Sequence, residues 1–527
     1  MIIYIYNILL FFIMLLILFF FIMNFFLFLY PLEWLFFSFK FNFYFNSMIF
    51  SFILLMVTSS VLVFSSYYLM GELNFSYYLM ILLIFVLSMF LLNYSYNAIS
   101  MLISWDLLGI SSFFLVLFYN NWDSCSGSMN TVLTNRLGDF FLFVFFSTSI
   151  FSGMTMLTYS FMFWSSLIFL ILTAFTKSAQ FPFSGWLPKA MSAPTPVSSL
   201  VHSSTLVTAG LLLLFNFNLM LMNSFSMSII FFVGLLTTLF SSLSALIEED
   251  LKKVVALSTL SQMGFSMMTF GLGMYFISLL HLLSHALFKS CLFMQVGYLI
   301  HCSFGQQDGR FYSILKFSPI FIQIQLLVTL FCLCGMLFTS GLVSKDIILE
   351  FFFFNKNYFI IMLMFFITVY LTFFYSYRLW KGLFNNFSLS FMHYSSSGLI
   401  NFISIFLCLF SIFFIWWMNF NLIFIPSFFI YLDFYVPLIY MFLFIFINYL
   451  LLKFILKDMV YKFLGDYLPK YFTNKLDSLK FFDNSLFNFS NYNISYFLNL
   501  SNIFNFYLYS NYFNSVVLVI FFLFILI

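Results

Sequence analysis

Long apolar runs, separated by short polar or Gly/Pro segments, occupy most of this 527-residue chain. A helix needs about 20 consecutive apolar residues to cross a bilayer, and the runs predict about fifteen such spans. The predicted spans lie near 8–30, 47–66, 77–93, 97–119, 131–151, 161–191, 195–217, 227–247, 253–270, 274–301, 318–354, 358–380, 399–417, 435–456 and 512–527. The predicted fold class is therefore an all-α membrane protein.

Two of these runs, 161–191 and 318–354, are too long for one straight helix. The first is interrupted at Gln180–Phe181–Pro182, because proline cannot continue a helical hydrogen-bond ladder. The second is interrupted between Gly335 and Gly341. Both runs are therefore predicted to form broken helices.

The two breaks predict an internal repeat. Each broken run is the fourth of five in the blocks 77–217 and 227–380, and each break has a lysine beside it, Lys177 or Lys345. A five-span unit ends on the opposite side of the membrane from its start, so a second copy must be inverted. Two inverted five-helix repeats with discontinuous helices are typical of transporters. The alternative is coincidence in an apolar chain, which the matching breaks and lysines disfavour.

Outside the repeats, residues 1–76 and 399–456 are predicted to form additional transmembrane helices. The segment 459–510 is too polar to span and too aromatic to be a free tail, so it is predicted to be a lateral amphipathic helix on the membrane surface. The closing run 512–527 is predicted to be an anchor helix.

The composition excludes a soluble domain, because 64% of the residues are hydrophobic and only 7% are charged. Soluble domains carry about 25% charged residues. A net charge of +3 makes nucleic acid an improbable partner. Of the six cysteines, only Cys332 and Cys334 lie close together in the sequence. This spacing favours buried thiols over a metal or iron–sulfur site. No dinucleotide or haem fingerprint is present, so no cofactor is expected in this chain.

The first residues, MIIYIYNILL, resemble neither a secretory signal nor a transit peptide. The 91 Phe, 32 Tyr and 29 Met residues are typical of an AT-rich genome. Both features favour synthesis inside a mitochondrion and a multi-pass location in its inner membrane. Lys252–Lys253 and the lysines of 453–480 are separated by an even number of spans, which favours the matrix side for both.

Ionisable residues inside the predicted spans are the candidate functional groups, because each costs roughly 2.5–3.5 kcal/mol or more at mid-bilayer. Asp106 is interpreted as a proton-pathway acid or a counter-charge, with a helix-end carboxylate as the alternative. Arg136 and Asp139 lie three residues apart on one helical face and can pair. Arg136 is expected to be structural because arginine keeps its proton, whereas Asp139 can take either role.

Lys177 is the strongest single candidate. Burial disfavours the charged form of a lysine and a nearby carboxylate favours it, so a moving carboxylate can make it bind and release a proton. The alternative is a lysine that extends to the interface. His202 follows four of the nine prolines and suits a proton relay, with a hydrogen-bonded interhelical histidine as the alternative.

A polar stripe is expected on the helix 274–301, where His281, His285 and Lys289 are spaced four residues apart. The His-x3-His spacing also occurs in zinc sites, but no suitable third ligand lies close in the sequence. The stripe is therefore interpreted as a wet polar path that joins the two repeats. Lys345, followed by Asp346 and Glu350, completes it.

Several long motifs resemble one protein family. They are NRLGD at 135–139, TKSAQFPFSGWLPKAMSAPTPVSSLVHSSTLVTAG at 176–210, EEDLKKVVALSTLSQMG at 248–264, HLLSHALFKSCLFMQVGYLIH at 281–301 and GLVSKD at 341–346. The region 95–380 is similar to the antiporter-like subunits of respiratory complex I and of multisubunit cation/proton antiporters. VHSSTLVTAG and the C-terminal surface element favour one complex I paralogue over the others. The family usually has glutamate where this chain has Asp106, and the resemblance leads us to expect one N-terminal span fewer than is usual in the family.

The resemblance implies a proton-translocating role for eight residues: Asp106, Asp139, Lys177, His202, His281, His285, Lys289 and Lys345. It also implies a core subunit in the membrane arm of mitochondrial complex I, coupled to electron transfer from NADH to ubiquinone. FMN, iron–sulfur clusters and ubiquinone are then expected in partner subunits. Expected partners are the other membrane-arm and accessory subunits and lipids such as cardiolipin. An Mrp-like antiporter subunit and a purely structural membrane spacer are the alternatives.

Overall fold

The computed structural model describes residues 26–29, 39–42, 45–95, 98–151, 164–218, 221, 223–312, 320–336, 339–354, 359–384 and 404–413. These ranges hold most of both predicted repeat blocks and all eight candidate site residues. The predicted span 435–456, the lateral element 459–510 and the anchor 512–527 lie outside the described residues.

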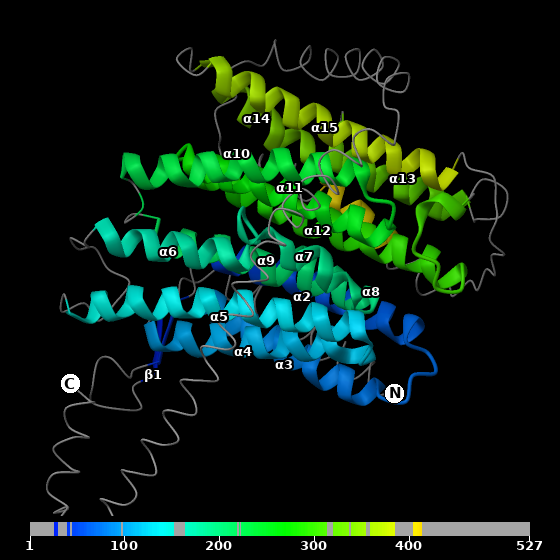
Figure 1. The fold of residues 1–527 in the computed structure, drawn as a ribbon, viewed down its shortest axis with the longest axis horizontal. Helices are drawn as coiled ribbons and strands as arrows, with labels where there is room; N and C mark the ends of the chain where they lie inside the picture. Colours follow the sequence, from blue (N-terminus) through cyan, green and yellow to red (C-terminus); the bar gives the residue numbers. More distant parts are fainter. Residues whose placement is uncertain are drawn as a thin grey trace, which may run out of the picture. The chain divides into compact units, whose positions relative to one another are not determined.

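Long helices follow the apolar runs closely. They are α2 (Phe45–Tyr68), α3 (Phe75–Tyr94), α4 (Ala98–Val116), α5 (Trp122–Phe151), α6 (Trp164–Lys177), α9 (Leu206–Asn216), α10 (Ser224–Ile247), α11 (Leu251–Gly271), α12 (Tyr275–Cys302), α13 (Ile320–Cys334), α14 (Ser340–Phe354) and α15 (Phe359–Phe384). A further helix spans Ser404–Phe413. Figure 1 shows the long helices side by side along a common direction. Within the described residues, six helices are long and apolar enough to cross a membrane.

The chain is a helical membrane protein with one exception that the all-α prediction missed. The predicted span 8–30 reaches into strand β1 (Phe26–Leu29), which pairs antiparallel with β2 (Phe39–Asn42). Both strands are rich in phenylalanine, a residue that favours strands, and their pairing satisfies backbone groups that a helix would otherwise satisfy internally. The count of about fifteen spans stays a prediction.

Both predicted helix breaks are present and share one geometry. α6 ends at Lys177, Ala179 has a φ of +56°, and the N–H of Gln180 donates to the carbonyl of Phe175 at 3.0 Å. In the second block, α13 is followed by Gly335 at φ +79°, and the N–H of Met336 donates back to Phe331 at 3.1 Å. Helices commonly end with a residue in the left-handed conformation and a hydrogen bond from a later N–H to the carbonyl five residues before it. The inverted relation of the two blocks stays a prediction.

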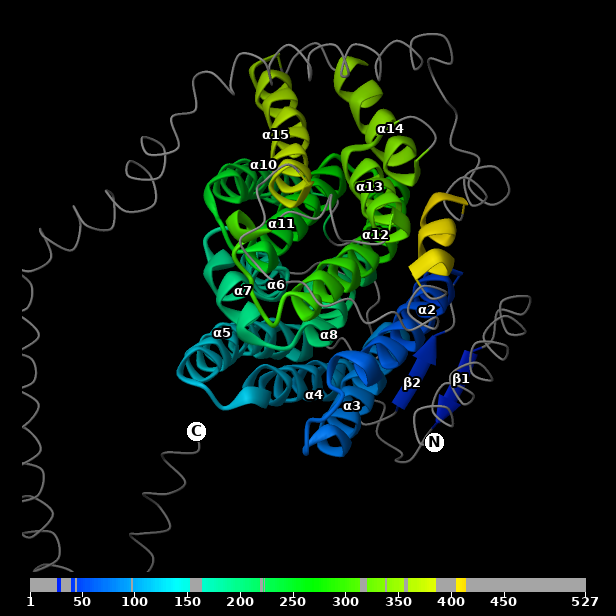
Figure 2. The same ribbon diagram turned by 90° about the vertical axis from the view of Figure 1, so that its right-hand side faces the viewer.

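α12 is the central helix of the described region. It packs against α11, α2, α13, α14 and the segment η5 (Ser198–Thr205). Figure 2 shows it among the four helices. All of its residues after Phe276 are buried except His301. His281, His285 and Lys289 on α12 are thus enclosed by protein.

Two glycines bring α10 and α11 together. A Cβ built on Gly234 would lie 2.8 Å from the backbone nitrogen of Met268 and 3.0 Å from the carbonyl oxygen of Gly264. Small residues allow this close approach of membrane helices, where packing is the main attraction. α11 is thereby held beside the central α12.

Candidate functional site

Lys177 lies at the break of the first block and is completely buried. Its Nζ donates a hydrogen bond to the carbonyl oxygen of Trp105 at 2.8 Å. The same nitrogen lies 4.0 Å from the centroid of a Trp105 ring, in a cation–π contact. A carbonyl oxygen and an aromatic face therefore stabilise the ammonium form without an adjacent carboxylate.

Asp106 and Asp139 meet at Arg136, next to this lysine. Arg136 Nη1 lies 2.8 Å from Asp106 Oδ1 and 3.1 Å from Asp139 Oδ2, so the predicted pairing of Arg136 with Asp139 is confirmed. In this structure Asp106 bridges to Arg136 and not to Lys177. Both carboxylates still interact electrostatically with Lys177. The four side chains form one charged cluster at α4, α5 and α6.

His202 lies in η5, a π-helical turn between Pro196 and α9. Prolines remove backbone donors from a helix, and π-helical turns are frequent at functional sites. The imidazole is buried, and neither ring nitrogen has a hydrogen-bond partner in the part of the chain that the structure describes. Its ring lies 6.0 Å from that of Trp186, whose Nε1 donates to the carbonyl of Thr176 beside Lys177. Trp186 thus contacts both His202 and the backbone next to Lys177.

The predicted stripe on α12 is present, and its three members are fully buried. Lys289 Nζ donates to the hydroxyl of Ser258 on α11 at 2.5 Å. His281 Nδ1 lies 2.9 Å from the hydroxyl of Ser344 on α14. His285, one turn from each, has no hydrogen-bond partner among the described residues.

Lys345 projects from α14 onto the end of the broken helix. Its Nζ donates to the carbonyl oxygens of Leu333 at 2.6 Å and Cys334 at 3.3 Å. A cation at a helix C-terminus is favourable, because the unpaired carbonyls carry partial negative charge. Lys345 also interacts electrostatically with His281 and Lys289. The two lysines and two histidines therefore form a second cluster.

Sequence analysis did not single out the hydroxyl partners Ser258 and Ser344. Serines are frequent in these helices, and most bond to a backbone carbonyl three residues earlier, as Ser258 also does with Val255. The two are distinguished by a contact with a lysine or histidine of another helix, Lys289 for Ser258 and His281 for Ser344. In the described residues, no three His, Cys, Asp or Glu side chains are grouped to hold a metal ion.

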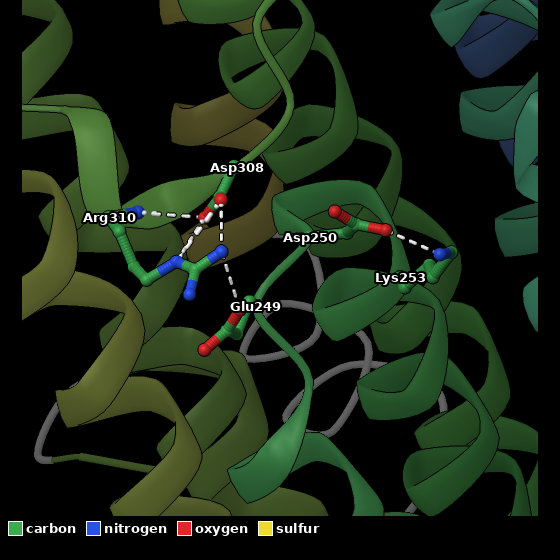
Figure 3. A network of polar contacts seen from close by, with 5 residues as sticks. All are labelled: Glu249, Asp250, Lys253, Asp308 and Arg310. Carbon is green, nitrogen blue, oxygen red and sulfur yellow. Dashed lines mark hydrogen bonds and ion pairs between the residues drawn. The ribbon is translucent and has the colours of Figure 1, made fainter.

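A separate ion-pair network ties two loops at the helix ends (Figure 3). Arg310 Nη2 lies 2.7 Å from Glu249 Oε2 and 2.6 Å from Asp308 Oδ2, and Lys253 pairs with Asp250. The Arg310 hydrogen bonds hold the pKa of Asp308 below its usual value. The neighbouring Lys252 is buried and its Nζ lies 3.3 Å from the carbonyl oxygen of Ala193, so it is not the free surface charge that the orientation argument assumed.

Comparison with known proteins places these clusters in a family. Residues 95–372 match the family model described as NADH:quinone oxidoreductase/Mrp antiporter, TM. The chain is 63% identical over 476 residues to NADH-ubiquinone oxidoreductase chain 5 of Caenorhabditis elegans, covering 90% of each chain. The chain belongs to the NADH-ubiquinone oxidoreductase chain 5 family. The chain 5 protein of Ascaris suum is also 63% identical, over 90% of this chain and 87% of its own length.

Solved structures support the antiporter-like fold of this chain 5 family member. A chain of the Mrp complex from Dietzia sp. matches with a TM-score of 0.68 at 24% identity, over 75% of this chain and 46% of that chain. The membrane-bound sulfane sulfur reductase, an archaeal respiratory complex, matches with a TM-score of 0.63 at 18% identity, over 72% and 82%. At these identities the matches show the fold alone.

Proposed function

We propose that this chain translocates protons across the mitochondrial inner membrane, as a membrane-arm subunit of complex I whose transport is coupled to electron transfer from NADH to ubiquinone. The observation that carries the proposal is the burial of Lys177, His202, Lys289 and Lys345 inside the helices of a membrane protein. Ionisable groups in this setting are costly and usually belong to ion or proton pathways. A structural spacer gains nothing from burying them.

Lys177 is the proposed switch of the first block. Arg136 and Lys177 compete for the carboxylates of Asp106 and Asp139, and in this structure Arg136 pairs with both. A carboxylate that moves toward Lys177 strengthens its hold on a proton, and one that returns to Arg136 weakens it. The proton then passes by way of His202, which has no competing hydrogen bond among the described residues.

The second block receives the proton on α12 and delivers it at Lys345. His285 and Lys289 lie one turn apart, Ser258 holds the Lys289 ammonium, and Ser344 faces His281. Hydroxyls both donate and accept hydrogen bonds, so they can pass a proton between such groups. Transfer between these side chains uses the hydroxyls and water. The two inverted five-helix repeats give each block its own switch.

Partner subunits complete this arrangement. The side chains of Asp106 and Arg136 are 40% and 49% exposed on the outward face of α4 and α5, where an ion pair in lipid would be costly. A neighbouring membrane-arm or accessory subunit is proposed to cover this face, with lipids such as cardiolipin at other surfaces. FMN, the iron–sulfur clusters and ubiquinone are assigned to partner subunits, and the segment 459–510 to contacts along the membrane arm.

The test is reconstitution of the purified assembly into sealed vesicles. NADH with ubiquinone is expected to drive uncoupler-sensitive proton uptake. The second candidate, an Mrp-like antiporter subunit, is favoured by the Mrp fold match and predicts proton movement driven by a sodium gradient without NADH. Sodium-driven exchange in the absence of a co-purifying flavin and iron–sulfur assembly would overturn the proposal.

A further inference from the structure

Two thiols from distant parts of the chain meet between α12 and the helix Ser404–Phe413, drawn in yellow in Figure 2. Cys291 Sγ and Cys408 Sγ are 3.3 Å apart although 117 residues separate them. Both residues are buried and both are free thiols. Neither belongs to the clusters described above.

Gln295 fixes this thiol pair. Its Nε2 donates toward Cys291 Sγ at 3.3 Å and toward Cys408 Sγ at 3.5 Å. Its Oε1 accepts a hydrogen bond from the hydroxyl of Thr329 on α13 at 2.9 Å, while the NH₂ faces sulfur. An amide NH₂ carries two hydrogens, one for each sulfur. The amide therefore stabilises negative charge on either sulfur, and the thiolate is the reactive form of cysteine.

We propose that Cys291 and Cys408 form a redox-active dithiol site that closes to a disulfide on exposure to a hydroperoxide. Sulfurs in a disulfide are about 2.05 Å apart, so the two sulfurs must approach by only about 1.2 Å from their 3.3 Å separation. In the described residues no third ligand accompanies the pair, which favours a bond between the sulfurs over a bridging metal ion.

The reaction consumes one hydroperoxide for each disulfide. The Cys408 thiolate attacks the peroxide oxygen, the O–O bond breaks, and a sulfenic acid forms with release of water or alcohol. The leaving hydroxide or alkoxide takes the proton lost by the Cys408 thiol. Cys291 then attacks the sulfenic sulfur and expels one water, formed from the sulfenic hydroxyl and the proton of the Cys291 thiol. Two sulfurs are oxidised by one electron each and the peroxide takes both electrons. Apolar burial makes thiols slow to react, so sustained exposure is needed.

The disulfide would tether α12 to the helix Ser404–Phe413. Cys291 lies two residues after Lys289, on the same central helix as His281 and His285. Oxidation thus restrains the helix that carries the titratable stripe. The bond itself does not depend on the proposed function of that stripe.

The test exposes intact mitochondrial membranes that hold the assembled complex to hydrogen peroxide, then denatures them in N-ethylmaleimide and digests the chain. Mass spectrometry is expected to find a peptide pair joined through Cys291 and Cys408, lighter by two hydrogens than the two thiol peptides together. Dithiothreitol before alkylation is expected to replace it with two separately alkylated peptides. This measurement uses the wild-type chain and needs no variant.

Two variants add specificity. The pair is expected to be absent in Cys408→Ser and retained in Cys302→Ser, which removes another buried cysteine of α12. Recovery of Cys291 and Cys408 from peroxide-treated wild type as separate alkylated, sulfinic or glutathione-bound peptides would overturn the proposal. A joined peptide between Cys291 and some other cysteine would overturn it as well.

Discussion

Replacing Lys177 with methionine removes the buried charge while keeping a long apolar side chain. The ammonium loses a hydrogen bond to the Trp105 carbonyl and a cation–π contact with its ring. These losses are about 1.5–3 kcal/mol for the charge-assisted hydrogen bond and about 2 kcal/mol for a desolvated cation–π contact. They are offset by relief of a desolvation cost of several kcal/mol. The complex is therefore expected to assemble.

Proton pumping is expected to fall much further than stability. A positioned proton donor or acceptor contributes about 100-fold or more to a rate, so NADH-driven pumping by Lys177→Met should approach the passive leak. Lys177→Arg retains a charge in the same place, but arginine does not release its proton. The Lys177→Arg variant is therefore expected to pump as poorly as Lys177→Met. This result would show that pumping needs a proton that can leave the side chain and not only a positive charge.

The assay is quenching of a proton-sensitive dye in vesicles, normalised to assembled complex on native gels. Lys189→Met is the matched control, because Lys189 lies twelve residues further along, in α7 (Trp186–Lys189), and is exposed. It is expected to pump normally. Normal pumping by assembled Lys177→Met would refute the lysine switch, and normal pumping by Lys177→Arg would refute its titration.

Three further substitutions address other parts of the structure. Asp106→Glu should pump and Asp106→Asn should not, because asparagine cannot titrate; equal pumping by both would make the carboxylate a static contact. Gly234→Ala should lower thermal stability by about 1–3 kcal/mol through overpacking, whereas Gly109→Ala, with nothing within 4 Å of its Cβ, should not. Asp308→Asn should speed hydrogen exchange in 303–312 at neutral pH. Folding lowers the pKa of Asp308 from its usual value of about 3.8. The wild-type ion pair of Asp308 with Arg310 should therefore persist above pH 3.8 and be lost only as the pH falls through the lower pKa of the folded protein.

The helix breaks and the buried charges could be predicted from the sequence because both have local causes. Gln180–Phe181–Pro182 interrupts a helix by its own backbone chemistry, and α6 ends three residues earlier. The stripe of His281, His285 and Lys289 follows from helical periodicity alone. Such features need no knowledge of which helices become neighbours.

Contacts between distant segments could not be predicted in this way. The hydrogen-bond acceptor of Lys177 is the backbone carbonyl oxygen of Trp105, 72 residues earlier. Every residue has such a carbonyl, so the sequence does not indicate which one the lysine contacts. Cys291 and Cys408 look unrelated in the sequence because their contact depends on how two helices pack. The β1–β2 ribbon was missed because phenylalanine-rich segments fit both an apolar helix and a strand.

The most direct test of the account is the number of protons pumped per NADH by complex that carries Lys289→Met. Lys289 is fully buried and hydrogen-bonded to Ser258 within the second block. If a proton passes from one block to the other along α12, the assembled variant should pump fewer protons per NADH than wild type. An unchanged ratio in fully assembled complex would contradict the proposed path.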